Sequence, residues 1–180
     1  MRFFIHLFIL TVILASSCQM SRKDYIKGIV KEWQGKEILI PEDEMVVKFL
    51  GRDTLCVDLW SKPYKIFTYI DSIGCTSCQL NFDPWKELIA LCQIQQLDVS
   101  FLFVIHSSNF ENFDDEVRFF EFDYPLIYDY KNSFDKINNF PPSPYRTFLL
   151  DKDNKIQVIG SPTNNSRIWE LYKKVISQQQ

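Results

Sequence analysis

The spacing of apolar residues changes repeatedly along the chain between a period typical of strands and one typical of helices. Apolar runs rich in β-branched and aromatic side chains predict buried strands at residues 65–70, 99–105 and 126–128. Segments with helical spacing separate these runs, and this alternation favours parallel pairing. The other expected elements are a hairpin from residues 45–50 and 54–59 with its turn at 51–53, helices starting at Asp83–Pro84, at 110–122 and at 133–138, strands at 146–150 and 155–159, and a last helix after Asn165. The pattern predicts an α/β fold with a mixed β-sheet, helices on both faces and an N-terminal β-hairpin extension.

The first residues follow a different pattern. Met1 and Arg2 form a short basic start, and residues 3–15 are almost wholly apolar. This run is too short to span a hydrocarbon core of about 30 Å, which needs roughly 20 residues, so it predicts an export signal. Small residues at positions 15–17 lead to Cys18, and this arrangement resembles the lipobox of bacterial lipoproteins. An ordinary cleaved signal with an incidental cysteine is one alternative, and a retained transmembrane anchor is a second and weaker one.

The sequence predicts three parts of the chain, and the lipobox resemblance implies the first boundary, before Cys18. Residues 1–17 are expected to be a signal peptide, 18–44 a tether and N-terminal extension, and 45–177 the folded domain. A lipid on Cys18 would attach the protein to a membrane of the cell envelope, facing the periplasm. Gln19 in the position after the lipidated cysteine favours the outer membrane by the rule known for such lipoproteins.

Length and composition support a single folded domain. The 180 residues include 46% hydrophobic and 16% aromatic side chains, which is enough apolar mass for a core. The net charge of −3 argues against a broad nucleic-acid surface, which needs a basic face.

Cys75 and Cys78 carry the strongest chemical signal, because they lie where a predicted strand passes into a predicted helix. The unpaired N–H groups at the start of a helix favour negative charge, so the pKa of the Cys75 thiol is expected to be depressed. Cys75 would attack a substrate disulfide, and Cys78 would resolve the mixed disulfide. An inert disulfide is the alternative. Structural zinc needs four ligands. The chain has only two histidines, and His6 lies in the predicted signal, so His106 is the one histidine left to the folded domain. A zinc site is therefore not expected at the dithiol.

The element order and the dithiol together resemble the thioredoxin-like superfamily, in particular its exported TlpA and ResA type thiol-disulfide oxidoreductases. Residues 147–155 are similar to the stretch that follows the cis-proline of that branch. The resemblance implies that this proline faces the dithiol and helps to bind substrate. Pro144 and Tyr145 are therefore the expected groove residues, together with the positions around the dithiol, Gly74, Thr76 and Ser77.

Three positions differ from the family pattern. Gly74 stands where the family usually has tryptophan, and Tyr69 stands where it often has a buried acid. Tyr145 aligns with the proline itself, so either Pro144 serves after a shift of one residue or the site lacks that proline.

Three other residues have two interpretations each. His106 ends a predicted strand at the edge where sites gather in parallel sheets, and it is either a proton carrier or a plain surface histidine. Cys56 and Cys92 are expected to be small core residues, although a disulfide between them is conceivable.

The expected function is thiol-disulfide exchange in the cell envelope with a protein thiol or disulfide as substrate or redox partner, without a cofactor. Whether the chain is an enzyme is open, since the departures at Gly74, Tyr69 and Tyr145 also suit a non-catalytic binding lipoprotein of the same fold. A copper-handling module is a further alternative, against which the two-residue cysteine spacing and the scarcity of histidine count.

Overall fold

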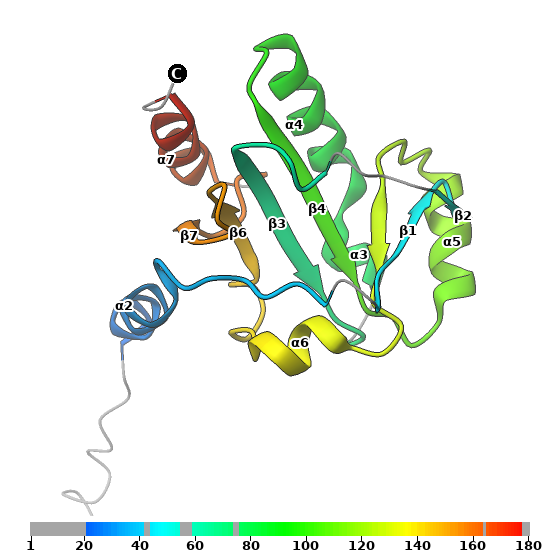
Figure 1. Cartoon of the computed structure of the whole chain (residues 1–180), viewed down its shortest axis with the longest axis horizontal. Helices are drawn as coiled ribbons and strands as arrows, with labels where there is room; N and C mark the ends of the chain where they lie inside the picture. The colour runs from blue at the N-terminus through cyan, green and yellow to red at the C-terminus, as the bar shows by residue number, and fades with distance from the viewer. Residues whose placement is uncertain (1–20, 42–43, 55–58, 74–75, 164, 178–180) are drawn as a thin grey trace, which may run out of the picture. The chain divides into compact units, whose positions relative to one another are not determined.

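The structure, a computed structural model, describes residues 21–41, 44–54, 59–73, 76–163 and 165–177 (Figure 1). The chain divides into two compact units, Met1–Lys31 and Glu32–Gln180. Helix α2 (Arg22–Trp33) begins after Ser21, whose hydroxyl accepts a hydrogen bond of 3.2 Å from the Asp24 N–H and so caps the helix. The predicted signal peptide and Cys18 lie outside the described residues. Within the described part, no helix is both long enough and apolar enough to cross a membrane.

The second unit is built on a mixed sheet with the strand order β2-β1-β5-β4-β3-β6-β7 (Figure 1). Its strands are β1 (Val46–Phe49), β2 (Arg52–Asp53), β3 (Tyr64–Ile70), β4 (Val99–Ile105), β5 (Leu126–Tyr128), β6 (Thr147–Leu150) and β7 (Ile156–Ile159). The pairs β3–β4 and β4–β5 are parallel, and the remaining pairs are antiparallel. The predicted mixed α/β sheet is confirmed.

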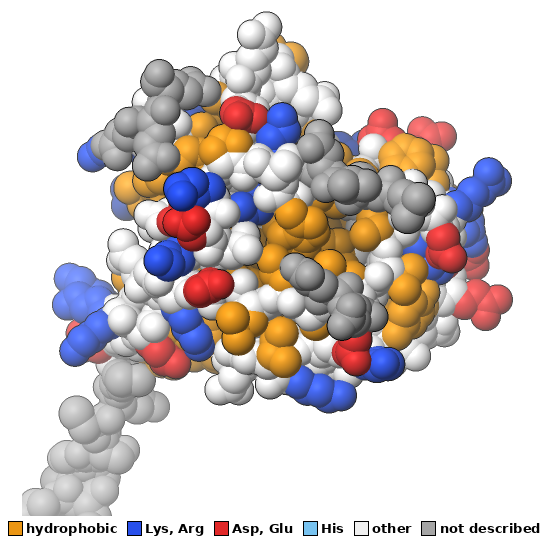
Figure 2. All heavy atoms as spheres, viewed as in Figure 1, with side chains coloured by type: hydrophobic (Ala, Val, Ile, Leu, Met, Phe, Trp, Pro, Cys, Tyr) orange, Lys and Arg blue, Asp and Glu red, His pale blue; other side chains and the backbone are white. Residues whose placement is uncertain are grey.

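Helices cover both faces of this sheet, as predicted. They are α3 (Thr76–Leu80), α4 (Phe82–Ile94), α5 (Phe110–Phe119), α6 (Ser133–Asn138) and α7 (Ser166–Ser177). Successive strand residues point to opposite faces, so Ile66 and Phe103 join a core cluster with residues of α4, α5 and α7. Phe67, the next residue in β3, lies on the other face, where its ring is 6.1 Å from that of Phe134 in α6. In the view of Figure 2, hydrophobic side chains gather over the middle of the sheet.

The hairpin exists, but its predicted turn was wrong. β2 contains Arg52, which pairs with Phe49 and therefore belongs to a strand. The turn is the two-residue loop Leu50–Gly51, in which both residues have positive φ, 49° and 74°. Two-residue hairpin loops of this kind match the twist of the flanking strands. Composition alone had favoured Gly51 with the two polar residues after it. Residues 55–58 of the expected second strand lie outside the described part.

The helical segment after the dithiol is interrupted, although not at the predicted residue. Asn81 takes a left-handed conformation, with φ 48° and ψ 76°, and it separates α3 from α4. Pro84, the predicted restart point, lies within the first turn of α4, where its missing N–H would have no helical acceptor. Asparagine tolerates the left-handed region better than most residues, which explains why the break occurs there.

Candidate functional site

Cys78 lies in the first turns of α3, is exposed to solvent and is disulfide-bonded. Gly74 and Cys75 lie outside the described residues, directly before this helix. Thr76, the first residue of α3, is buried, and its hydroxyl donates a hydrogen bond of 3.3 Å to Ser107. This bond attaches the start of α3 to the loop that follows β4. Substrate contacts of Gly74, Thr76 and Ser77 stay predictions.

The helix behind the dithiol is short. α3 has only five residues before the break at Asn81, so few aligned peptide dipoles lie behind its N-terminus. The free N–H groups of the first turn are then the main source of stabilisation for a thiolate at this place. The assignment of Cys75 as the attacking sulfur stays a prediction, because Cys78 is itself exposed.

Pro144 lines a groove beside this helix. The Ser143–Pro144 peptide bond is cis. Pro144 shares a groove of about 290 Å³ with Gln79 and Asn81, which lie at the end of α3 and just after it. Of the two sequence-based alternatives, the arrangement agrees with Pro144 serving after a shift of one residue. Tyr145 is half-buried next to it in the chain.

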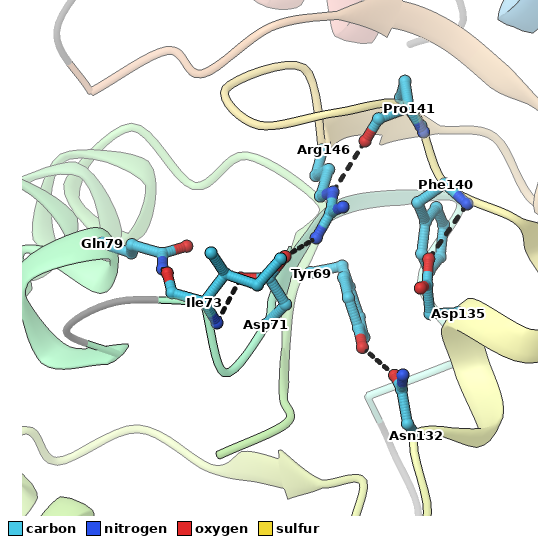
Figure 3. Close-up of polar contacts among 9 residues, drawn as sticks. All are labelled: Tyr69, Asp71, Ile73, Gln79, Asn132, Asp135, Phe140, Pro141 and Arg146. Carbon is cyan, nitrogen blue, oxygen red and sulfur yellow. Dashed lines mark hydrogen bonds and ion pairs between the residues drawn. The ribbon is translucent and has the colours of Figure 1, made fainter. Parts of the chain in front are cut away.

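A buried ion pair that the sequence analysis missed lies next to the groove. The Arg146 guanidinium pairs through Nη1 with the Asp71 carboxylate, and its Nε donates a hydrogen bond of 2.6 Å to the Pro141 carbonyl (Figure 3). The Arg146 and Asp71 side chains are only 14% and 12% exposed. One available signal was the position of each charge directly against a buried strand, Asp71 after β3 and Arg146 before β6.

Tyr69 stands where the family pattern places an acid, and its surroundings keep the tyrosine hydroxyl uncharged. The Tyr69 hydroxyl donates a hydrogen bond to Asn132 Oδ1 (Figure 3). Burial, followed by the charge of Asp135, raises the pKa of Tyr69 well above its usual range. The Arg146 guanidinium lies 5.6 Å from the centre of the Tyr69 ring, close enough for a cation–π contact. Tyr69 is therefore protonated at neutral pH and does not replace a carboxylate as a proton acceptor.

Burial also raises the pKa of two core tyrosines. Desolvation is the first cause for both Tyr128 and Tyr172, and a hydrogen bond to Asp114 adds to it for Tyr128. The unfolded chain releases these protons near pH 10, whereas the folded chain keeps them to higher pH. Their contribution to stability is thus complete below pH 10 and is lost above it. Burial lowers the pKa of Lys65, so the folded chain releases this proton at a lower pH than the unfolded chain does. The effect of Lys65 on stability therefore becomes more favourable as the pH rises.

We expect the free energy of unfolding to fall as pH rises above 10, by about 1.4 kcal/mol per pH unit for each such tyrosine. Urea unfolding of the full chain between pH 8 and 11 measures this decline. Tyr172→Phe removes one titrating group and its hydrogen bond of 2.9 Å to the Gly160 carbonyl. The variant should therefore lose stability more gradually with pH than the wild type. Equal slopes for the two proteins would contradict the assignment.

His106 follows β4 at the same edge of the sheet. Its backbone N–H donates to the Ile70 carbonyl at 2.8 Å, and its Nδ1–H donates to the Asp129 carbonyl at 2.9 Å. These bonds hold the half-buried ring between β3 and the segment after β5, with Nε2 as the remaining polar atom. A role as proton carrier stays a prediction.

The remaining described cysteine is structural. Cys92 is a free thiol buried in α4, and burial raises its pKa to about 11. It is therefore a core residue, as predicted, and the alternative disulfide to Cys56 is excluded. Cys56 itself lies outside the described residues. Within the described ranges, no group of three or more His, Cys, Asp or Glu side chains could hold a metal ion.

The architecture is a thioredoxin-like fold, as comparison with solved structures shows. A candidate thiol:disulfide interchange protein, DsbE, from Chlorobium tepidum superposes with a TM-score of 0.60 at 11% identity, over 79% of this chain and 97% of that chain. A thiol:disulfide interchange protein from Bacteroides sp. gives 0.54 at 12% identity, over 79% and 88%. AhpC from Enterococcus faecalis gives 0.55 at 14% identity, over 75% and 89%.

Similarity to known proteins is detected in the structure and not in the sequence. No protein-family model and no curated protein matches the chain. At these low identities the structural likeness demonstrates the shared fold, and activity must be argued from the residues of this chain.

Proposed function

We propose that this chain is a thiol-disulfide oxidoreductase of the cell envelope whose redox pair is Cys75 and Cys78. The observation that carries the proposal is Cys78 itself, an exposed, disulfide-bonded cysteine at the start of a helix in a thioredoxin-like fold. Cys75 is the natural partner, because two residues on a helical turn bring two sulfurs into disulfide range. The groove at Pro144 opens beside the same helix.

The proposed reaction is an exchange of one disulfide for another. The Cys75 thiolate attacks one sulfur of a substrate disulfide, and the other substrate sulfur leaves as a thiolate. Cys78, after losing its proton, then attacks the Cys75 sulfur and releases the second substrate thiolate. Two electrons pass to the substrate, which becomes a dithiol, while the protein becomes a disulfide. The reverse sequence oxidises a substrate dithiol, and the reduction potential of the pair decides which direction operates.

The proposed location follows from the N-terminal sequence. An export signal would carry the domain into an oxidising compartment, and a lipid on Cys18 would hold it at a membrane. Inhibition of signal peptidase II in cells tests this location, because the uncleaved precursor should then accumulate. The thiol:disulfide interchange proteins among the similar structures agree with a protein thiol or disulfide as the partner.

A single-turnover reaction tests the proposal. Reduced protein, freed of reductant, is mixed with a disulfide-bonded peptide, quenched with acid at intervals and mapped by mass spectrometry. We expect peptide dithiol and a Cys75–Cys78 disulfide to form in equal amounts, and faster than the same concentration of glutathione forms peptide dithiol. Cys92 is the internal control and should remain a thiol. An exchange rate no greater than that of glutathione would instead favour a non-catalytic binding protein.

A further inference from the structure

Arg146 connects two segments that border the groove. Its guanidinium holds the Asp71 carboxylate with Nη1 and the Pro141 carbonyl with Nε (Figure 3). Asp71 follows β3 on the way to the dithiol, and Pro141 begins the segment that leads to Pro144. A guanidinium is a rigid planar fork, so one side chain fixes the distance between both partners.

The contacts continue from Asp71 to the helix that carries Cys78. The second Asp71 oxygen accepts a hydrogen bond of 3.0 Å from the Ile73 N–H, and the Ile73 carbonyl accepts one of 2.5 Å from Gln79 Nε2 (Figure 3). The Ile73 backbone is thus held on both sides, while its side chain is 77% exposed. An unbroken series of polar contacts therefore joins Pro141, Arg146, Asp71, Ile73 and Gln79.

This series spans the groove. Gln79 lines it from the end of α3, and Pro144 and Arg146 line it from the segment before β6. A buried ion pair is weak evidence for added stability, because the desolvation of two charges offsets their attraction. Its clearer physical consequence here is a fixed separation of the two groove walls.

We propose that Arg146 is a positioning residue that sets this separation, and thereby selects peptide disulfides over small ones. The inference rests on the proposed function. A peptide disulfide must lie between the two walls to present its sulfur, so misplacement of one wall by about 1 Å lowers its reaction rate steeply. A small disulfide needs only an accessible thiolate, so its reaction rate should not depend on the separation of the two groove walls.

Two variants separate positioning from folding. In Asp71→Asn/Arg146→Gln both charges are removed together, so no buried charge is left unpaired. Arg146→Lys keeps the positive charge for Asp71, but a single ammonium lacks the fork that also holds Pro141. Arg118→Gln is the matched control, because it breaks an arginine–aspartate pair, with Asp115, that is largely exposed. Urea unfolding verifies that each variant is folded under the assay conditions.

Single-turnover rates are measured over a range of concentrations of a disulfide-bonded peptide and of bis(2-hydroxyethyl) disulfide. For both Arg146 variants we expect the apparent second-order rate constant to fall about tenfold or more with the peptide, mainly through a higher half-saturating concentration. With the small disulfide it should change less than about twofold, as it should for Arg118→Gln with either substrate. Parallel losses on both substrates, or wild-type rates with the peptide, would overturn the inference. If the wild type exchanges with neither substrate, the proposed function itself fails.

Discussion

Replacing Cys75 by serine is expected to abolish exchange with a disulfide-bonded peptide, lowering the single-turnover rate on the order of a thousandfold or more. A serine hydroxyl is not ionised near pH 7, and the thiolate is the form that attacks a disulfide. Cys78→Ser should behave differently, because attack by Cys75 still occurs while the second step is blocked. That variant should accumulate a mixed disulfide between Cys75 and the peptide, visible by non-reducing electrophoresis and intact-mass spectrometry.

The matched control for these variants is Cys92→Ala, which removes a buried thiol and leaves the proposed redox pair intact. It should exchange at the wild-type rate, although the free energy of unfolding falls because a core contact is lost. Because Cys78 is itself exposed, the comparison of the two serine variants decides which of the two sulfurs attacks the substrate. If Cys78→Ser is inactive and Cys75→Ser traps the peptide, then Cys78 is the attacking sulfur and the two roles are exchanged.

The sheet could be predicted from the sequence because its central strands are long apolar runs. β3 and β4 are buried along nearly their whole length, and such runs have few other stable arrangements. The breaks between elements were harder to predict. Asn81 and Leu50 adopt left-handed conformations. Each lies close to a more obvious signal in the sequence, Pro84 after Asn81 and the polar residues 52–53 after Leu50.

The dithiol could be predicted because both cysteines lie close together in the sequence. The ion pair could not, because Asp71 and Arg146 are 75 residues apart and meet only through the antiparallel pairing of β3 with β6. The bond from Thr76 to Ser107 has the same origin, since it depends on the parallel pairing of β3 with β4. Local sequence patterns therefore predict the two reactive cysteines, but they do not predict the contacts between strands that orient the site.

The start of the folded unit is another long-range property. Sequence patterns placed residues 18–44 in a tether and extension, while the compact unit begins at Glu32. The Gly35 N–H donates to the Ile156 carbonyl at 2.8 Å, and the Ile38 N–H donates to the Asn154 carbonyl at 2.9 Å. The segment after Trp33 therefore adds backbone hydrogen bonds at the β7 end of the sheet, and the C-terminal part of the extension belongs to the fold.

Trp33 should be the main anchor of this segment, and Trp33→Ala is expected to lower the free energy of unfolding by about 3–5 kcal/mol. The side chain is 2% exposed, and its ring stacks on Phe148 in β6 at 5.8 Å and on Phe140 at 6.1 Å. Alanine leaves a large apolar cavity that a well-packed aromatic cluster cannot fill.

Urea unfolding of the chain from Cys18 onward, followed by circular dichroism, measures this loss. Leu39→Ala is the matched control, since Leu39 lies in the same segment but is 50% exposed, and its replacement should cost less than about 1 kcal/mol. A loss for Trp33→Ala as small as that for Leu39→Ala would mean that residues 32–44 do not stabilise the domain. In that case a chain beginning at Met45 would be as stable as the longer one. If the anchor is real, the shorter chain should lose at least as much stability as Trp33→Ala, because it lacks both the ring and the hydrogen bonds to the β7 end.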